Sequence, residues 1–420
     1  MPAKRIYYDD AFEREFTAEV LRCERAGGGV DAGGGAKENS GAELWRVTLD
    51  RTAFYPSSGG QPNDTGHLGE ARVLDVVDED EEVIHVVDRR IEPGPVSGRI
   101  DWERRFDHMQ QHSGQHLLSA VFHGKFALPT VSFHLGAKLC SIDLRGREPT
   151  QEILGVAADA VNALVYEDRA VKVRYGTAEE LAAEGVRKTV ERAGVLRAIE
   201  IEGVELQPCG GTHVRSTGQI GMILLRGVSR IRQDWRVEFA CGKRAERLAR
   251  EDYATVKAVA QRLNCAAQET VAAAERVVQE RDAHFKSARA SLEKLAEAEA
   301  RAAVQATEAG GDGVRVVARV FHGVEPEYAQ CFAREVGKAE QAVALVARGE
   351  CGSIFFAQHA SAGQDMNALL AETLKEIGGK GGGSRDVARG RLAEAGRAQE
   401  FVNRAAAILR EKRDAKLQGD

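Results

Sequence analysis

Short apolar runs alternate with turn-forming segments over roughly the first 95 residues. The runs AEVLRCE, ELWRVTLD, EARVLDVVD and EVIHVVD are rich in β-branched and other apolar residues, and Gly, Pro, Asn and Asp separate them. Closely spaced short strands of this kind are typical of small barrels. We therefore expect an N-terminal β-barrel. The stretch at 25–41 is too rich in glycine to pack, so it is either a mobile hairpin tip or, in the interpretation we favour, a tolerated insertion.

A change of period follows, in the segment DHMQQHSGQHLLSAVFHGKF. Leu117, Leu118, Val121 and Phe122 recur at helical spacing, which predicts a helix. Beyond it, the pattern predicts a strand (VSFHLGAKLCSIDL), a helix (QEILGVAADAVNALVYE), a strand (AVKVRYG) and a short helix. Antiparallel strands with helices on one side indicate a central α+β domain.

The segment from residue 243 to 309 contains neither Gly nor Pro, and apolar residues recur by sevens at Val278, Phe285 and Leu292. This pattern predicts a long helix or a helical hairpin, and it suits a coiled-coil dimer equally well. The remaining residues alternate strands and helices, which indicates an α/β domain. The predicted fold class is thus a multidomain α+β protein. The expected domains are 1–95 (barrel), 96–245 (central), 246–309 (helical) and 310–420 (C-terminal).

Composition narrows the class of protein. The N-terminus has no apolar core of a signal peptide, and no stretch approaches the roughly 20 apolar residues that cross a bilayer, so we expect a cytoplasmic protein without a membrane partner. Seven scattered cysteines do not form a disulfide framework. The formal charge of −6 disfavours indiscriminate binding to polyanions, although a local basic face could still hold a nucleic acid.

Two pairs of residues carry the clearest chemistry. His112 and His116 are four apart on the predicted helix, and Cys209 and His213 are four apart in PCGGTH, where two glycines permit a tight backbone path. A thiolate with three imidazoles suits Zn²⁺. We therefore predict one zinc ion per chain, held by these four residues.

A metallopeptidase is the first alternative, since zincins also use a helical histidine pair. Their catalytic Glu directly follows the first histidine, and Ser113 occupies that position here, which argues against it. His108 lies four residues upstream on the same face, and we expect it at the surface or behind the ligands. No Glu near either motif presents itself as a catalytic base.

Several longer motifs, in this order, resemble one family. These are RTAFYPSSGGQPNDTG, QQHSGQHLLSA, VSFHLG, CGGTHVRSTGQIG and GGKGGGSRDVARG. The chain resembles the freestanding alanyl-tRNA editing proteins, the AlaX group, and the editing domain of alanyl-tRNA synthetase. Its C-terminal part resembles the tRNA-contacting domain of the synthetase, as in the long form of the group. The resemblance implies zinc-dependent hydrolysis of an amino acid wrongly esterified to tRNA(Ala). Because the chain begins at the barrel, without an adenylate-forming domain, we expect no use of ATP.

The resemblance also implies roles for single residues. Thr52 matches a position associated with recognition of the serine hydroxyl, although a β-branched residue also suits a strand. Gly59 and Gly60 resemble a glycine-rich substrate-binding loop, or else form a simple turn. His134 is expected in the pocket, where synthetases commonly place a Gln. Thr52 and His134 are therefore the candidate catalytic-pocket residues.

The expected partner is tRNA(Ala) mischarged with serine or glycine. A pocket for alanine discriminates poorly against glycine, which is smaller, and serine, which adds one hydroxyl, so a second, hydrolytic site is needed. Residues 380–420 carry ten Lys or Arg against six Asp or Glu, and Lys380 and Arg385 in the glycine-rich motif are the expected tRNA contacts. A homodimer through the helical segment is possible. The alternative function is a tRNA-binding protein with a purely structural zinc, because four protein ligands normally close a site.

Overall fold

The computed structural model describes residues 3–26, 43–79, 82–186 and 194–417. The chain divides into two compact units, Met1–Ala258 and Val259–Asp420, and each is described by itself. This division is coarser than the four domains expected from the sequence, whose borders stay a prediction. The glycine-rich segment predicted as a hairpin tip falls almost entirely outside the described residues.

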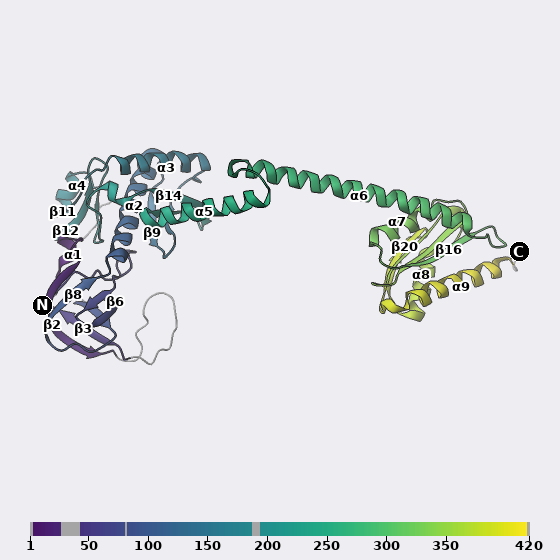
Figure 1. Ribbon diagram of the computed structural model, residues 1–420, viewed down its shortest axis with the longest axis horizontal. Coiled ribbons are helices and arrows are strands. Elements are labelled where there is room, and N and C mark those ends of the chain that lie inside the picture. Colours follow the sequence, from purple (N-terminus) through teal and green to yellow (C-terminus); the bar gives the residue numbers. More distant parts are fainter. Residues whose placement is uncertain (1–2, 27–42, 80–81, 187–193, 418–420) are drawn as a thin grey trace. The chain divides into compact units, whose positions relative to one another are not determined.

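A closed barrel forms the first part of unit 1 (Figure 1). Alternation along its strands turns every second side chain inward, as the burial of Phe16, Ala18 and Val20 shows. Beside the barrel, β1 (Lys4–Arg5) and β4 (Arg51–Thr52) form a short parallel pair. The short helix α1 (Ile6–Asp9) follows β1 in the chain. In spatial order the barrel strands are β2 (Glu15–Arg25), β3 (Trp45–Leu49), β7 (Glu82–Val87), β6 (Ala71–Glu79), β5 (Gly66–Leu68) and β8 (Gly94–Ile100).

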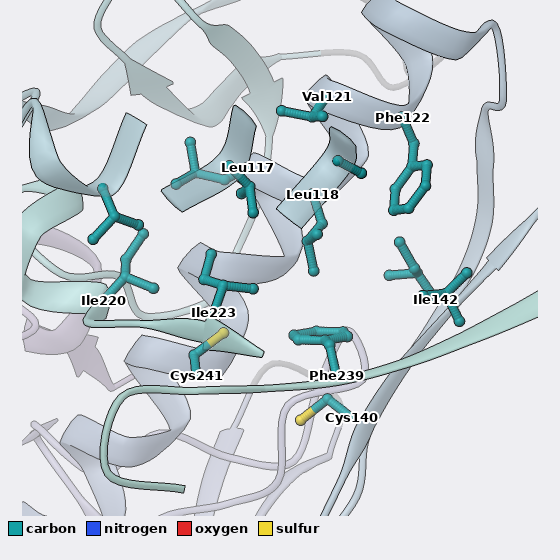
Figure 2. Packing of buried hydrophobic residues seen from close by; sticks show 14 of the residues in the cluster. Leu117, Leu118, Val121, Phe122, Cys140, Ile142, Ile220, Ile223, Phe239 and Cys241 are labelled. Atoms are coloured by element: carbon teal, nitrogen blue, oxygen red, sulfur yellow. The ribbon is translucent and has the colours of Figure 1, made fainter. Parts of the chain in front are cut away.

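The second part of unit 1 is an α+β domain built around the long helix α2 (Trp102–Phe126). Figure 2 shows Leu118 and Phe122 of this helix facing Phe239 and Ile142 of a four-stranded sheet, and all four are buried in one core. The sheet order is β14 (Ile223–Ile231), β15 (Asp234–Cys241), β10 (Cys140–Leu144) and β9 (Thr130–Leu135). The single strand predicted at 131–144 is thus a hairpin of two strands.

A second, three-stranded sheet completes this domain. Its strands are β11 (Val171–Thr177), β12 (Val195–Ile201) and β13 (Glu205–Pro208), accompanied by α3 (Gln151–Tyr166), α4 (Ala178–Ala183) and η1 (Thr217–Ile220). A buried ion pair joins the barrel to α2: Arg105 donates to both carboxylate oxygens of Asp64 and to the carbonyl of Ala53 at 2.5 Å. Because a buried charge without its partner is costly, this pair fixes the helix against the barrel.

The predicted helical segment is two helices, α5 (Gly242–Arg262) and α6 (Thr270–Ala306), with η2 (Ala267–Glu269) before α6. The break falls where Asn264 has a positive φ of 51°. The last turns of α6 pack into the core of unit 2 through Ala296, Ala300 and Ala303, whereas Phe285 is 70% exposed. A coiled-coil partner for the exposed heptads stays a prediction.

The rest of unit 2 is a five-stranded sheet with helices on both faces (Figure 1). Two separate cores lie against it, one under α6 and α7 (Pro326–Val336) and one under α8 (Met366–Ile377) and α9 (Ala398–Leu417). The strand between these cores, β17 (Ala342–Arg348), is therefore buried almost throughout. None of the helices in the described ranges is long and apolar enough to cross a membrane. The sheet order is β16 (Arg315–Phe321), β17 (Ala342–Arg348), β18 (Ser353–Gln358), β20 (Val387–Leu392) and β19 (Gly379–Gly383), and the helical elements are α7 (Pro326–Val336), η3 (Ala360–Ala362), α8 (Met366–Ile377), η4 (Ala395–Arg397) and α9 (Ala398–Leu417).

Candidate metal centre

The fold brings the two predicted ligand pairs together. His112 and His116 project from one face of α2, and Cys209 and His213 lie just after β13. The four ligand atoms lie within 4.8 Å of one another, with Cys209 Sγ 3.5 Å from His112 Nε2 and 3.3 Å from His213 Nε2. Tetrahedral zinc with bonds of roughly 2.0–2.3 Å places its ligands about 3.3–3.7 Å apart. The cluster therefore fits a zinc ion after small adjustments of its side chains.

Each histidine is held by its other ring nitrogen. His112 Nδ1 lies 2.9 Å from Gln61 Oε1, His116 Nδ1 lies 2.9 Å from Glu205 Oε2, and His213 Nδ1 lies 3.1 Å from Ser113 Oγ. Such bonds fix the orientation of a ligating imidazole and turn its Nε2 toward the metal. Three orienting residues, Gln61, Ser113 and Glu205, are therefore part of the centre.

Sequence reasoning did not identify these three residues as supports of the ligands. Glu205 precedes Cys209 by four residues, and along an extended chain this spacing sends both side chains to the same side; β13 ends at Pro208, directly before Cys209. Alternation through Glu205, Gln207 and Cys209 was the signal that could have found it. Gln61 comes from the barrel, and only folding shows that it reaches across to His112 and Thr212.

Electrostatics favour a cation at this point. Burial by itself raises the pKa of the Cys209 thiol, but the adjacent His112 and His213 rings bring it well below its usual range. Burial opposes charge on His116, yet hydrogen bonds to Cys209 and Glu205 raise its pKa to about 10. Burial lowers the pKa of His213 to about 3, which keeps that ring neutral as metal binding requires. The Cys209 thiolate and the Glu205 carboxylate together attract positive charge, and a metal ion bound here would displace the proton from His116.

A cavity of about 370 Å³ opens on this cluster. Gly59 lines it at a φ of +57°, and a Cβ on Gly60, at a φ of +85°, would come within 3.2 Å of the Phe133 carbonyl oxygen. Gly60 of this barrel loop thus approaches strand β9 closely because it lacks a side chain. The other lining residues are Tyr55, Ser58, His112, Gln115, His116, Ser119, Thr130, Val131, Ser132, Phe133, Glu205, Gln207, Pro208, Cys209, Gly210 and Gly211.

Two predicted pocket residues lie elsewhere. Phe133 lines the cavity and stacks on His112, whereas the side chain of His134 is 60% exposed near Asp143 and is not among the lining residues. Thr52 is fully buried and is not among the residues that line the cavity. Its hydroxyl lies 2.8 Å from His85 Nε2 and accepts a hydrogen bond from the Phe54 amide. Substrate contact by Thr52 or His134 stays a prediction.

The structure also shows where His108, two glutamines of α2 and the two proposed tRNA contacts lie. His108 is buried rather than at the surface, and it does not belong to the ligand cluster. Two glutamines of α2 flank the ligands: Gln111 binds both backbone groups of Cys241, so it is structural, whereas Gln115 lines the cavity. Lys380 on the edge strand β19 and Arg385 in the turn after it are exposed in unit 2.

The chain is similar to known proteins over most of its length. Residues 196–237 match the family described as "Threonyl and Alanyl tRNA synthetase second additional domain". The chain is 31% identical to "Alanyl-tRNA editing protein Aarsd1" from Mus musculus and to "Alanyl-tRNA editing protein AlaX-L" from Pyrococcus horikoshii, in each case over 93% of this chain and 94% of the relative. It is also 31% identical to "Alanine--tRNA ligase" from Pyrococcus abyssi, over 97% of this chain and 44% of the ligase.

The fold and the site thus define a multidomain α+β protein with a synthetase-type additional domain and a Cys–His₃ cluster. The long matches above 30% identity identify the family more narrowly. The chain belongs to the alanyl-tRNA editing proteins, which confirms the resemblance seen in its motifs. Among solved structures, "Crystal Structure of the C-Ala domain from Aquifex aeolicus alanyl-tRNA synthetase" covers 25% of this chain and 93% of that chain at 23% identity, with a TM-score of 0.21.

Proposed function

We propose that this chain is a zinc-dependent aminoacyl-tRNA deacylase that acts in trans on tRNA(Ala) mischarged with serine or glycine. The observation that carries the proposal is the cavity that opens directly on the Cys–His₃ cluster. A metal that only stabilised the fold would need no such space beside it. Membership in the alanyl-tRNA editing proteins supplies the substrate class.

The reaction is ester hydrolysis. The oxygen of water bonds to the carbonyl carbon and the bond from that carbon to the sugar oxygen breaks. One proton of the water goes to the sugar oxygen, which leaves as the terminal tRNA hydroxyl, and the other goes to solvent as the amino acid leaves with its carboxylate. Zinc held by His112, His116, Cys209 and His213 would supply a Lewis acid that polarises the carbonyl or lowers the pKa of water toward about 7. The chain itself fixes the imidazoles through Gln61, Ser113 and Glu205 and brings the backbone of Gly59 to the cavity.

A second function deserves a test, because four protein ligands usually leave a tetrahedral metal without an open position. In this alternative the zinc is structural, and the protein binds tRNA with little hydrolysis. Under both functions, we propose that Lys380 and Arg385 contact tRNA phosphate or sugar, since both are exposed and the surrounding segment 380–420 is locally basic.

The deciding experiment measures ester half-lives on tRNA(Ala) charged with labelled serine, glycine or alanine. With zinc-loaded protein we expect serine and glycine to be released much faster than alanine. Cys209→Ala should lose both the activity and most of the zinc, whereas Cys265→Ala, outside unit 1, serves as the matched control. Half-lives equal to those without protein, at concentrations that bind tRNA, would favour the structural alternative.

A further inference from the structure

Arg197 lies behind the loop that carries Cys209 and is not among the residues that line the cavity. It is half-buried on β12, beside β13 in the three-stranded sheet. Its main-chain carbonyl accepts a hydrogen bond from the Cys209 amide at 3.1 Å. Its side chain returns to the same loop, where Nη1 donates to the carbonyl of Cys209 at 2.6 Å and to the carbonyl of Gly211 at 3.0 Å. The backbone and the side chain of one residue thus hold both ends of the loop 209–211.

The guanidinium of Arg197 is itself fixed in place by the N-terminal segment. Its Nε donates to the Tyr8 carbonyl at 3.1 Å, and its Cζ lies 5.4 Å from the centroid of the Tyr8 ring. A planar guanidinium presents five N–H donors in one rigid arrangement, whereas a lysine ammonium is a compact charge on a flexible stem. The three carbonyls around Arg197 therefore use the property that distinguishes arginine from lysine.

The loop that Arg197 holds contacts two proposed metal ligands, one from each pair. Cys209 belongs to the loop, and its Sγ accepts a hydrogen bond from the Gly211 amide at 3.4 Å. Gly211 also packs on the ring of His112, so closely that a Cβ at this glycine would lie 2.1 Å from the ring carbon Cε1. A shift of the loop would therefore move the thiolate of Cys209 relative to the imidazole of His112.

A chain of hydrogen bonds also leads from Arg197 to His112. The carbonyl of Gly211 and the amide of Thr212 belong to one peptide group, and this amide donates to Gln61 Oε1 at 3.1 Å. The same oxygen lies 2.9 Å from His112 Nδ1. Because successive hydrogen bonds polarise one another, the bond from Arg197 to the Gly211 carbonyl strengthens the Thr212 amide as a donor and so helps to hold Gln61.

We propose that Arg197 is a positioning residue of the metal centre, which fixes Cys209 directly and His112 through Gly211 in the arrangement that binds zinc. This inference rests on the proposed function, in which these residues hold the metal. Arg197 acts through the ligands and not on the substrate, because it does not line the cavity.

The test measures the affinity of the full chain for zinc, by titration against a chelator that changes colour when it binds the metal. Arg197→Lys keeps the positive charge but cannot hold three carbonyls at once, and we expect its zinc affinity to fall by about tenfold or more. Arg174→Lys is the matched control, since Arg174 is exposed in the same sheet and pairs with Glu184 and Glu200. Cobalt(II) in place of zinc gives a second readout, because its absorption from the thiolate should change in Arg197→Lys and stay the same in the control.

Kinetics at saturating zinc separate positioning from contact with tRNA. In Arg197→Lys we expect kcat for Ser-tRNA(Ala) to fall while KM stays nearly unchanged. An unchanged zinc affinity together with an unchanged cobalt spectrum would overturn the inference, as would a raised KM at unchanged zinc affinity, which would make Arg197 a tRNA contact.

A second variant decides the question should Arg197→Lys fail to fold. Tyr8→Leu removes the ring beside the guanidinium and keeps the Tyr8 carbonyl, and we expect a smaller loss of zinc affinity in the same direction. Unchanged affinity in Tyr8→Leu would then overturn the inference. Failure of the proposed function looks different, because the unaltered chain would leave the serine and glycine esters intact while the change in zinc affinity could still be measured.

Discussion

At the scale of single residues, the centre depends on side chains that do not themselves ligate. Glu205 is the strongest case, because its carboxylate meets His116 Nδ1 inside the cavity wall. A carboxylate behind a ligating imidazole fixes the ring and increases its basicity. Ser113, at the position where a zincin carries its catalytic Glu, instead orients His213 and accepts from the Val214 amide.

We predict that Glu205→Gln weakens zinc binding by about ten- to a hundredfold, because the amide keeps the shape of the side chain but loses its charge. Competition with a chromophoric chelator measures this affinity directly, without reference to activity. Glu202→Gln is the matched control, since Glu202 is exposed and outside the cavity. Equal zinc affinities in both variants would show that Glu205 does not support the metal.

A second residue-scale prediction concerns His85 in the barrel core. Burial lowers the pKa of His85 to about 4, against an ordinary value of 6.5. The folded chain therefore keeps this ring neutral where the unfolded chain takes up a proton, so stability is lost as the pH falls from about 6.5 to 4. At about 1.4 kcal/mol per pKa unit, the loss approaches about 3 kcal/mol.

Urea unfolding of the full chain between pH 7 and about 4.5 checks this expectation. His85→Gln should unfold at lower urea at pH 7, because it disturbs the contacts with Thr52 and Val47, but it should show a flatter dependence on pH. The exposed His134→Gln should keep the dependence of the unaltered chain. Parallel curves for all three proteins would exclude His85 as the source.

At the scale of elements, the periodicity of apolar residues predicted those helices and strands that are determined by their own local sequence. The helix with His112 and His116 is present as α2, and the runs expected to be strands form β2, β3, β6 and β7 of the barrel. The strands β5 and β8 escaped notice, because Gly66, Gly94 and Gly98 dilute their apolar pattern. Two of these glycines serve packing: a Cβ on Gly66 would lie 2.1 Å from the Arg99 carbonyl oxygen, and one on Gly98 would meet the ring of Phe16.

The candidate site shows where prediction from sequence stops. The four proposed ligands could be grouped because each pair is local. The sequence did not single out Phe133, which lines the cavity, and named its neighbour His134, whose contact with substrate stays a prediction. Contacts between elements, such as Gln61 with His112, depend on tertiary packing and leave no periodic trace.

At the scale of the whole molecule, the two units carry different parts of the proposed function. Every proposed metal ligand and every residue lining the cavity lies in Met1–Ala258, whereas Lys380 and Arg385 lie in Val259–Asp420. Because these residues lie in separate units, one set of changes can remove the proposed hydrolysis and another can weaken the proposed tRNA binding, each without the other. The four ligands also report on folding: His116 and Cys209 are 93 residues apart, so they meet only in the folded unit.

We predict that a chain ending at Asn264, in the turn after α5, keeps its zinc and its kcat but binds mischarged tRNA more weakly. Its KM should rise about tenfold or more, because phosphate contacts supply much of the affinity of proteins for nucleic acids. In the full chain, the double change Lys380→Ala and Arg385→Ala should also raise KM and make KM less dependent on the salt concentration. Lys257→Ala in α5 removes one positive charge elsewhere and is the charge-matched control for one of the two changes. Zinc content verifies that the shortened chain folds. An unchanged KM in the shortened chain would mean that unit 1 binds the tRNA by itself and that the C-terminal unit serves another purpose.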